Sequence, residues 1–506
     1  ENILAYRKTI AQKHSVDVVA GTAAQVTKDT YAGTGNAQDF LSNTVFTGNI
    51  QSAGIPGLPS SSYSKTALAS FVGRVNYTFD QRYLLTLSFR RDGYSAYSAD
   101  SRWQNFPSAA IAWRVSNESF MQGQRVVSDL KVRASYGRTG STSIGPYQTQ
   151  NILQPYTTIF GDAMYIGYAP RKEYPGNLRW ETTNQMDVGI DAGLFNNKVR
   201  ITADYYYKRT SDLLNRVQLP TSFGYEESLR NVGEISNRGL EFAVDATVIE
   251  NKDWKWTLGG NIAFNRNKVE KLYEGQDIVS PNIFTGNIND YVNILRVGEP
   301  VYAFYGYKEI GYTDNGLIRY EDKNNDGAIN NLDRSIIGDP NPDFIYGLNS
   351  TTRYRNFELT LFFQGSQGNQ IFNLNKAANL DMGWGLNQPV DVYTDHWTPE
   401  KTNAKYPKPS NKINGNFSTR FVEDGSYLKL RNIMLAYNLP VSNWKISAFK
   451  SAQIYVSGQN LIRITNYSGY DPEVNAYGSA TSLSQGIDYT IYPNNKSYTV
   501  GIRCGF

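Results

Sequence analysis

Hydrophobic and polar residues alternate through the last nine positions of the chain, residues 498–506, which read Y-T-V-G-I-R-C-G-F. Successive side chains of a β-strand point to opposite faces of its sheet. The alternation therefore predicts a strand with one apolar face, formed by Tyr498, Val500, Ile502, Cys504 and Phe506. Taken alone, this segment fits the closing strand of an outer-membrane β-barrel and a half-buried strand of a soluble sandwich equally well.

The same alternation recurs upstream in pairs of segments joined by very short turns. The clearest pair covers residues 71–79 and 83–90, with the turn at Asp80 and Gln81. Further turns of this kind lie at residues 196–197, 251–253, 355–356 and 439–440. Each pair predicts a β-hairpin.

Long segments rich in Gly, Asn and Pro separate these hairpins. They cover residues 28–66, 139–183, 210–237, 268–342, 367–426 and 459–497. Compact soluble domains rarely contain so many long connections. A transmembrane barrel expects them, because its strands are joined by short periplasmic turns and long extracellular loops. The pattern therefore predicts an all-β fold, a transmembrane antiparallel β-barrel.

The predicted strands number about fifteen, and the first and the last both run inward. A finished bacterial barrel has an even number of strands and no open edge. We therefore expect an odd number of further strands before Glu1. On this interpretation, residues 1–506 are the C-terminal part of a longer β-barrel protein.

Composition excludes several other classes of protein. The chain is 40% hydrophobic and no stretch approaches the ~18 consecutive apolar residues of a membrane-spanning helix. Its 37 Tyr suit strands and the aromatic girdles of barrels. The 50 basic and 46 acidic residues form no long run of one sign, which argues against nucleic-acid binding. His14 and His396 are the only histidines and neither lies in a catalytic motif, so we expect no enzyme.

Seven longer motifs occur along the chain: F-V-G-R-V-N-Y from Phe71, R-Y-L-L-T-L-S-F-R-R-D-G from Arg82, L-K-V-R-A-S-Y-G-R-T-G from Leu130, L-R-W-E-T-T-N-Q-M-D-V-G-I-D from Leu178, N-V-G-E-I-S-N-R-G-L-E-F from Asn231, H-W-T-P-E-K-T-N-A-K-Y-P from His396 and Y-L-K-L-R-N-I-M-L-A-Y-N-L-P from Tyr427. In these motifs and their order, from about residue 71 to the end, the chain resembles the SusC/RagA family of TonB-dependent outer-membrane transporters of Bacteroidota.

The resemblance implies a barrel of 22 strands, with seven strands, a plug domain and a TonB box upstream of this chain. It also implies a SusD-like surface lipoprotein that acts as a lid, import of oligosaccharides or peptides, and energy relayed through TonB. A transport-inactive barrel that serves as a structural or assembly component of a larger outer-membrane complex has the same strand pattern. The two hypotheses are distinguished by the proteins that accompany the barrel.

The loop predicted over residues 268–342 contains a segment, residues 322–333, with the spacing of an EF-hand calcium loop. Its oxygen donors are Asp322, Asn324, Asp326, the carbonyl of Ala328, and Asp333 at the twelfth position, with Gly327 at the sharp turn. Asp333 replaces the usual Glu, and no flanking helices are evident. The segment predicts a structural calcium site, with magnesium as a second candidate and a run of Asx turns as the metal-free alternative.

Aromatic residues of the predicted outer loops are candidates for contact with a ligand or with the lid. We expect Trp384, Tyr393 and Trp397, within the lid-facing loop 367–426, to be the best of these, and Phe284, Tyr291 and Tyr467 are further examples. Such residues more often stabilise their own loop. Five basic residues on the polar strand faces either meet cargo or the plug, or else pair with acidic neighbours: Arg74, Arg90, Arg133, Lys208 and Arg503.

Overall fold

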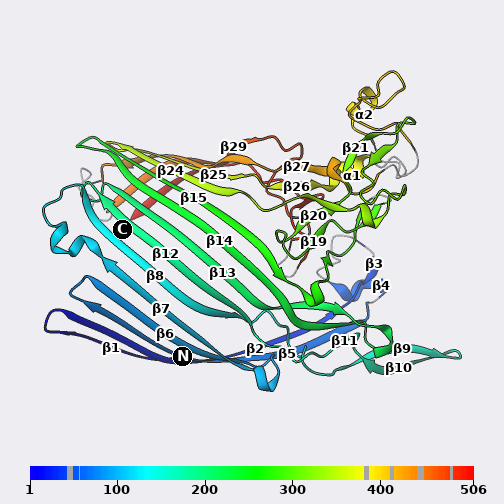
Figure 1. Cartoon of the computed structure of the whole chain (residues 1–506), viewed down its shortest axis with the longest axis horizontal. Coiled ribbons are helices and arrows are strands. Elements are labelled where there is room, and N and C mark those ends of the chain that lie inside the picture. Colours follow the sequence, from blue (N-terminus) through cyan, green and yellow to red (C-terminus); the bar gives the residue numbers. More distant parts are fainter. Residues whose placement is uncertain are drawn as a thin grey trace. The chain divides into compact units, whose positions relative to one another are not determined.

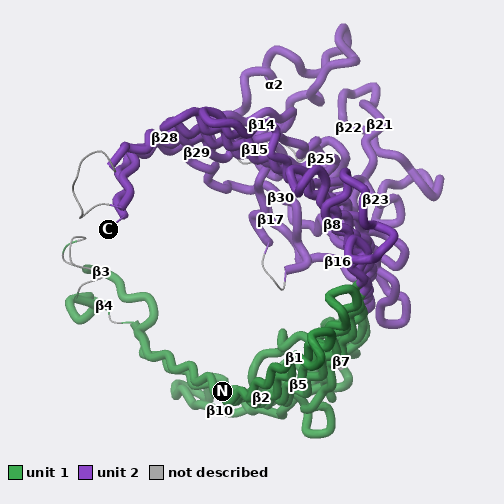
Figure 2. Tube along the Cα trace, turned by 90° about the vertical axis from the view of Figure 1, so that its left-hand side faces the viewer, with its two compact units in different colours: residues 1–112, 135–185, 210–233 green, residues 113–134, 186–209, 234–506 purple. Residues whose placement is uncertain are grey.

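A computed structural model describes residues 1–40, 42, 49–55, 57–285, 288–380, 387–410, 415–441, 450–478 and 482–505 (Figure 1). The chain divides into two compact units (Figure 2). The first comprises residues 1–112, 135–185 and 210–233, and the second comprises residues 113–134, 186–209 and 234–506.

Within the described residues, one sheet of 16 strands dominates the fold. Fifteen of them follow one another in chain order, and the remaining strand, β11 (Glu173–Tyr174), pairs in parallel beside β14. The fifteen are β1 (Asn2–Ile10), β2 (His14–Thr34), β5 (Pro59–Phe79), β6 (Tyr83–Tyr94), β7 (Trp103–Arg114), β8 (Val127–Ser141), β12 (Glu181–Leu194), β13 (Val199–Gln218), β14 (Glu227–Glu250), β15 (Trp254–Lys271), β24 (Phe344–Tyr354), β25 (Phe357–Gln367), β28 (Tyr427–Leu439), β29 (Ser451–Thr465) and β31 (Ser497–Gly505). The predicted strand count is confirmed.

Short turns have the backbone conformation that tight hairpins require. Asp80 and Gln81 both have positive φ, 50° and 55°. Two consecutive left-handed residues form the turn whose twist matches antiparallel strands. At the turn between β12 and β13 three consecutive residues, Phe195, Asn196 and Asn197, have positive φ, of 54°, 57° and 60°. These predicted hairpins are therefore confirmed, as are the pairings β14·β15 and β24·β25.

Two of the predicted loops are shorter than expected because their flanking strands are longer. β2 and β5 remain paired as far as Thr34 and Pro59, and β13 and β14 extend to Gln218 and from Glu227. These extensions contain runs such as S-S-S-Y-S-K, which are polar on both faces. A strand that continues beyond the hydrocarbon layer needs no apolar face, so alternation did not reveal it.

The second unit shows the two faces of the sheet through the register of its strands. One row across β15, β24, β25, β28, β29 and β31 consists of large apolar or aromatic side chains, namely Trp254, Tyr354, Phe357, Tyr437, Ile454 and Ile502. Arg353 and Glu358, one residue away on the opposite face, form an ion pair of 2.6 Å. The exposed apolar face and its aromatic row near the short turns match a lipid-facing surface with an interfacial girdle.

The longer connections also contain short elements. These are β3 (Gln38–Phe40), β4 (Ala53–Ile55), β9 (Leu153–Phe160), β10 (Ala163–Pro170), β16 (Ile278–Val279), β17 (Ile283–Thr285), β18 (Ile288–Asp290), β19 (Asn293–Leu295), β20 (Ala303–Gly306), β21 (Glu309–Tyr312), β22 (Ile318–Tyr320), β23 (Ser335–Gly338), β26 (Gln370–Asn373), α1 (Leu374–Leu380), α2 (Val390–Thr394), β27 (Val422–Asp424) and β30 (Ile487–Asp488). Among the helices of the described chain, none combines the length and apolar character needed to cross a membrane.

The first unit has its own core, which explains the L-R-W motif. Leu178 and Trp180 are both buried, and the Trp180 ring stacks on Tyr97 at 4.9 Å between centroids. Phe106 meets the same indole edge to face at 5.5 Å. The core therefore joins the segment before β12 to strands β6 and β7.

The assignment of the apolar face predicts that the same substitution at two adjacent residues of β29 has very different effects on stability. Val456 lies on the exposed apolar face, between Leu435 and Val500 in register, whereas Ser457 lies on the opposite face. We expect Val456→Arg to destabilise the protein in bilayers by about 2 kcal/mol, because the cation enters hydrocarbon, and Ser457→Arg to cost under ~1 kcal/mol. Equilibrium unfolding in lipid vesicles measures both, and equal costs would contradict the assignment of faces.

Candidate functional site

Three long connections of the second unit, residues 272–343, 368–426 and 466–496, share one hydrophobic core. Its fully buried members come from all three segments: Ile283, Val292, Phe304, Phe372, Leu374, Ala377, Phe417, Phe421 and Ile487. Two small sheets frame this core, one in the order β16-β19-β20-β23 and one in the order β27-β26-β30. These connections are therefore folded rather than unstructured, which alternation along the strands did not predict.

Buried polar contacts fix the connections to one another. The Asn293 amide donates to the carbonyl of Tyr302 at 2.7 Å and to that of Gln485 at 3.0 Å, and its oxygen accepts from the Gln485 amide at 3.2 Å. Gly486 follows with φ of +71°, and a Cβ there would lie 2.5 Å from Pro340. A side chain larger than hydrogen at Gly486 would force the last connection away from the first.

Alternating cations and tyrosine rings stabilise the 272–343 connection. The Arg296 guanidinium lies 4.8 Å from the Tyr305 ring, which stacks on Tyr291 at 6.2 Å with 8° between planes. Arg334 lies between the rings of Tyr291 and Tyr307, 4.4 and 4.8 Å from their centroids. Each such contact contributes roughly 0.5–2 kcal/mol. Tyr291 is thus engaged within its own loop.

Carboxylates neutralise the two cations of this stack. Arg296 pairs with Asp277 at 2.7 Å, and the buried Arg334 pairs with Asp290. Next to the stack, burial raises the pKa of Tyr320 to about 12, and its oxygen accepts a hydrogen bond from the Asn416 amide at 2.8 Å. The ring is therefore uncharged at neutral pH and joins the first connection to the second.

A buried ion network attaches the last connection to β28. Lys429 is 2% exposed and donates to Asp471 at 2.6 Å, and it also contacts Glu473. Arg431 pairs with Glu473 from the same strand. Burial opposes ionisation of Asp471, but hydrogen bonds from Lys429 and from the Glu473 amide outweigh it and hold the pKa of Asp471 below its ordinary value.

The predicted calcium loop forms a compact turn in the first connection. Both oxygens of Asp322 accept backbone hydrogen bonds, from the amides of Asp326 at 3.3 Å and Gly327 at 2.8 Å. Gly327 has φ of +83°, as the sharp turn at the sixth position requires. The side-chain nitrogen Nδ2 of Asn330 lies within hydrogen-bond distance of both Asp326 and the carbonyl of Ala328, at 3.3 and 3.1 Å. Two of the predicted ligand oxygens therefore converge on one point.

Asp333, the predicted twelfth ligand, serves the loop backbone. Its two oxygens accept from the amides of Lys323 at 2.9 Å and Asn330 at 2.8 Å, and the side chain is buried. Within the described residues, no group of three or more His, Cys, Asp or Glu side chains converges on a metal position. A cation at this turn must therefore also use Asn324 and backbone oxygens.

The three aromatic residues predicted to meet the lid or a ligand differ in their surroundings. Trp384 lies outside the described residues. Trp397 is 7% exposed, and its ring covers Gly316 so closely that no Cβ would fit there. Tyr393, on α2, is 82% exposed. Tyr467 is also buried, with its hydroxyl 2.6 Å from Asp488. Of these residues, Tyr393 alone presents its ring at the surface of the described chain.

Four of the five basic residues predicted on the polar strand faces contact carboxylates or aromatic rings of the protein itself. Arg133 contacts Asp204 at 2.7 Å and Asp191 at 3.3 Å, and Arg90 contacts Asp92 at 2.7 Å. Lys208 lies over the ring of Tyr206 and Arg503 over that of Tyr455. Pairing with acidic neighbours, one of the two predicted alternatives, is confirmed for Arg133 and Arg90.

The hairpin β9·β10 presents an apolar surface that the sequence pattern did not single out. It forms a sheet of only two strands, and Asp162 at its turn is its single charged residue. The register places five exposed apolar side chains on one face, namely Leu153, Ile159, Met164, Ile166 and Tyr168, each 57–73% exposed. Phe160, Tyr165 and Tyr156 lie on the other face and are 70%, 54% and 41% exposed. The scarcity of charge over residues 153–170, where Asp162 is the single charged residue, is the sequence feature that could have indicated this surface.

A meander of antiparallel strands with an exposed apolar face, short turns on one side and folded connections on the other defines an outer-membrane β-barrel protein with structured external loops. The family model described as "TonB dependent receptor-like, beta-barrel" matches residues 5–461, and the chain belongs to this family. The family is one of outer-membrane transporters, not of enzymes.

Individual relatives agree with this assignment. The chain is 35% identical to TonB-dependent receptor P3 of Formosa agariphila over its whole length, covering 52% of that protein. It is 32% identical to TonB-dependent receptor SusC of Bacteroides thetaiotaomicron, over 88% of this chain and 44% of that protein. A structure of the RagAB peptide transporter superposes with a TM-score of 0.85 at 26% identity, covering 100% of this chain and 55% of that one. The chain thus spans about half the length of the relatives it matches.

The buried network around Lys429 predicts how the last connection responds to substitution. Lys429→Met leaves the buried Asp471 without its nearest cation, while Glu473 keeps its pair with Arg431. We expect this to cost about 3–5 kcal/mol. We expect faster proteolytic cleavage within residues 466–496, while the surface substitution Lys401→Met, which breaks an exposed pair with Asp395, changes stability by under ~1 kcal/mol. Limited proteolysis of both variants measures this, and equal cleavage rates would contradict a stabilising role.

Proton linkage gives this network a defined pH dependence. The pKa of Asp471 is lower in the folded protein than the ~3.9 of an unfolded chain. Asp471 therefore contributes to the free energy of unfolding above pH ~3.9, and this contribution is lost as the pH falls through the lower pKa of the folded state. We expect protection of residues 466–496 to decrease below about pH 4 in the wild type. In Lys429→Met, acidification in this range should slow cleavage, because protonation of Asp471 removes a buried charge that has lost its nearest cation.

Proposed function

We propose that the complete protein imports an oligosaccharide or a peptide across the outer membrane, with energy supplied through TonB and a SusD-like surface lipoprotein as its lid. The observation that carries this proposal is the likeness to the RagAB peptide transporter along 100% of the chain, together with family membership. The relative named SusC supports the same class of transporter. The proposal covers both an oligosaccharide and a peptide as the imported molecule.

The folded external connections support a role in holding a partner. Their common core, the Arg–Tyr stack and the Lys429 network make a rigid surface, on which recognition requires little ordering on binding. Tyr393 and its neighbour Val390 on α2 are 82% and 79% exposed. This part of the loop 367–426 is the segment that the sequence predicts to face the lid.

The hairpin β9·β10 provides a second candidate contact for the lid. A two-stranded sheet is marginally stable in water, and contiguous exposed apolar surface is typical of an interaction site. The hairpin lies in the connection between β8 and β12, and the alternation of short and long connections assigns that connection to the external side. A surface lipoprotein seated there would cover the apolar face.

Purification from the native outer membrane in mild detergent, followed by mass spectrometry, tests the proposed function. We expect one surface lipoprotein to accompany the wild-type protein, and Ile166→Asp to reduce its recovery about tenfold or more, because the carboxylate loses its water at the apolar contact. Gln154→Asp adds the same charge on the other face of the hairpin and should retain the lipoprotein. Recovery of several assembly factors without a lid would instead support the structural-component hypothesis.

We also propose that the turn at residues 322–333 binds calcium in a structural role. The convergence of Asp326 and the Ala328 carbonyl on one point, with Asp322 and Asn324 beside them, supports this. Calcium accepts six to eight oxygens at flexible geometry, whereas magnesium demands a stricter octahedron, so the mixed set favours calcium. A bound cation would displace the side-chain amide nitrogens of Asn324 and Asn330, which now contact Asp326.

Calorimetric titration of the purified protein with calcium tests this site. We expect Asp326→Ala to weaken calcium binding at least tenfold, because it removes one charged ligand, and Asp314→Ala, in an exposed turn nearby, to leave it unchanged. A chelator should speed proteolysis near residue 325 in the wild type alone. Identical titrations of the wild type and Asp326→Ala would exclude the site and leave the Asx-turn alternative.

A further inference from the structure

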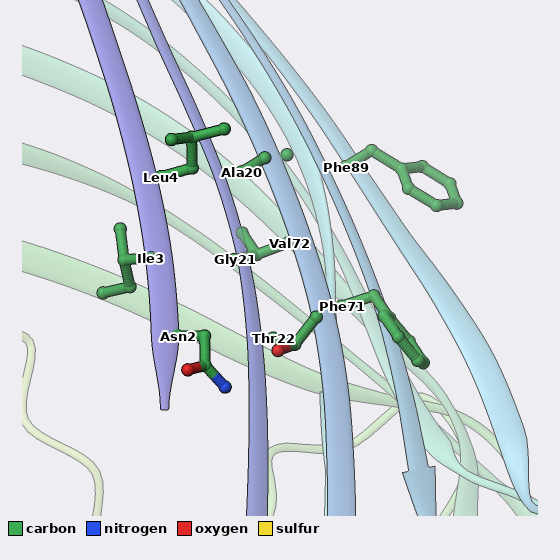
Figure 3. A pocket seen from close by; sticks show the side chains of 10 residues that line it. Asn2, Ile3, Leu4, Ala20, Gly21, Thr22, Phe71, Val72 and Phe89 are labelled. Carbon is green, nitrogen blue, oxygen red and sulfur yellow. The ribbon is translucent and has the colours of Figure 1, made fainter.

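The first unit contains a groove on the apolar face of strands β1, β2, β5 and β6 (Figure 3). The register places Leu4, Ala20, Gly73 and Phe89 in one row across these four strands. Leu4 and Phe89 are large and at least half exposed, whereas the two residues between them are the smallest available. The row therefore forms a depression two strands wide between two apolar walls.

The depression is open above Gly73 and is closed at the end toward the short turns by larger side chains. A Cβ built on Gly73 would meet nothing within 4 Å, so its floor is backbone. The next row toward the short turns is large throughout, with Tyr6, Val18, Val75 and Leu87 in register. The volume of the groove is about 570 Å³, within the range of small-ligand sites.

Polar groups lie at the opposite end of the groove. There the row across the same strands is Asn2, Thr22, Phe71 and Arg91. The Arg91 guanidinium lies over the Trp103 ring at 5.6 Å, and the Phe71 ring lies 6.0 Å from the same indole. Within the described chain, no carboxylate forms an ion pair with Arg91. We call this polar end of the groove, formed by Asn2, Thr22, Phe71 and Arg91 with Trp103, the rim. A cation and a Trp side by side are typical of a membrane interface.

The position of the rim along the strands places it at the outer interface. Phe79 and Tyr83 form the row beside the short turn, and Phe71 and Arg91 lie eight residues further along β5 and β6. At ~3.4 Å per residue this separation is about 27 Å along the strand, before tilt is taken into account. It is comparable with the ~25 Å apolar band of such barrels. The polar end therefore faces the side of the long connections.

We propose that this groove binds an acyl chain of lipid A, the phosphorylated glycolipid of the outer leaflet, with Arg91 contacting its phosphate. The chain would lie over Ala20 and Gly73 between Leu4 and Phe89. Charge complementarity selects this occupant, because Arg91, which no carboxylate of the described chain neutralises, lies at the outer end of an apolar groove that faces lipid. The same groove seated against a second copy of the protein would bring two Arg91 side chains into apolar surroundings without a counter-ion.

Native mass spectrometry of the full protein in detergent, titrated with monophosphoryl lipid A or phosphatidylcholine, tests the proposal. Gly73→Leu fills the floor without a backbone clash, and we expect it to weaken lipid A binding at least fivefold. Ala109→Leu places the same side chain at an exposed position on β7, outside the groove, and should bind as the wild type does. Arg91→Gln should lose the preference for lipid A over phosphatidylcholine, and Arg91→Lys should keep most of it.

Four results would overturn the proposal. Equal binding by the wild type and Gly73→Leu would exclude the groove. Equal affinity of the wild type for lipid A and phosphatidylcholine, or an undiminished preference in Arg91→Gln, would exclude the role of the cation. Conversion of a dimer to a monomer by Gly73→Leu would identify a second copy as the occupant. Heat-modifiable migration in gels confirms that each variant has folded before it is titrated.

Discussion

The constraint on which this structure depends is that every backbone N–H and C=O at hydrocarbon depth must find a protein partner, since lipid provides none. The meander of β1 to β31 satisfies it by pairing each strand with its neighbours in the sheet. Once the backbone is paired in this way, side chains alternate between lipid and the polar face, and the register produces rows such as Tyr354, Phe357 and Tyr437 on one side. The same alternation allows Arg353 and Glu358 to pair on the other side.

Outside the hydrocarbon layer the rules of a soluble protein apply. The external connections of the second unit have no lipid to pack against, and they bury Phe304, Phe372 and Ile487 in a core of their own. Cations are stabilised there by aromatic faces and carboxylates, as for Arg334 and Lys429. Most of the aromatic residues in these segments are therefore occupied by the fold, and the exposed ones, such as Tyr393, become the more informative positions.

Two exposed apolar surfaces differ in what they are suited to contact. The hairpin β9·β10 lies in an external connection, where water surrounds it and a protein partner would cover it. The groove at Ala20 and Gly73 lies in the strand wall, where lipid surrounds it, so apolar exposure alone has no cost. Arg91, which no carboxylate of the described chain neutralises, makes the groove distinctive.

The sequence by itself determined the barrel class, the count of about fifteen strands, the short turns and the family, because period-two alternation and turn residues are local properties. It also indicated a sharp turn at Gly327, whose conformation follows from its neighbours. Only the tertiary structure decided that β2, β5, β13 and β14 continue beyond the apolar band, since apolar and polar residues do not alternate in their outer parts. Likewise, the burial of Trp397 and the shared core of three connections depend on contacts between segments up to about 200 residues apart, which no local pattern records.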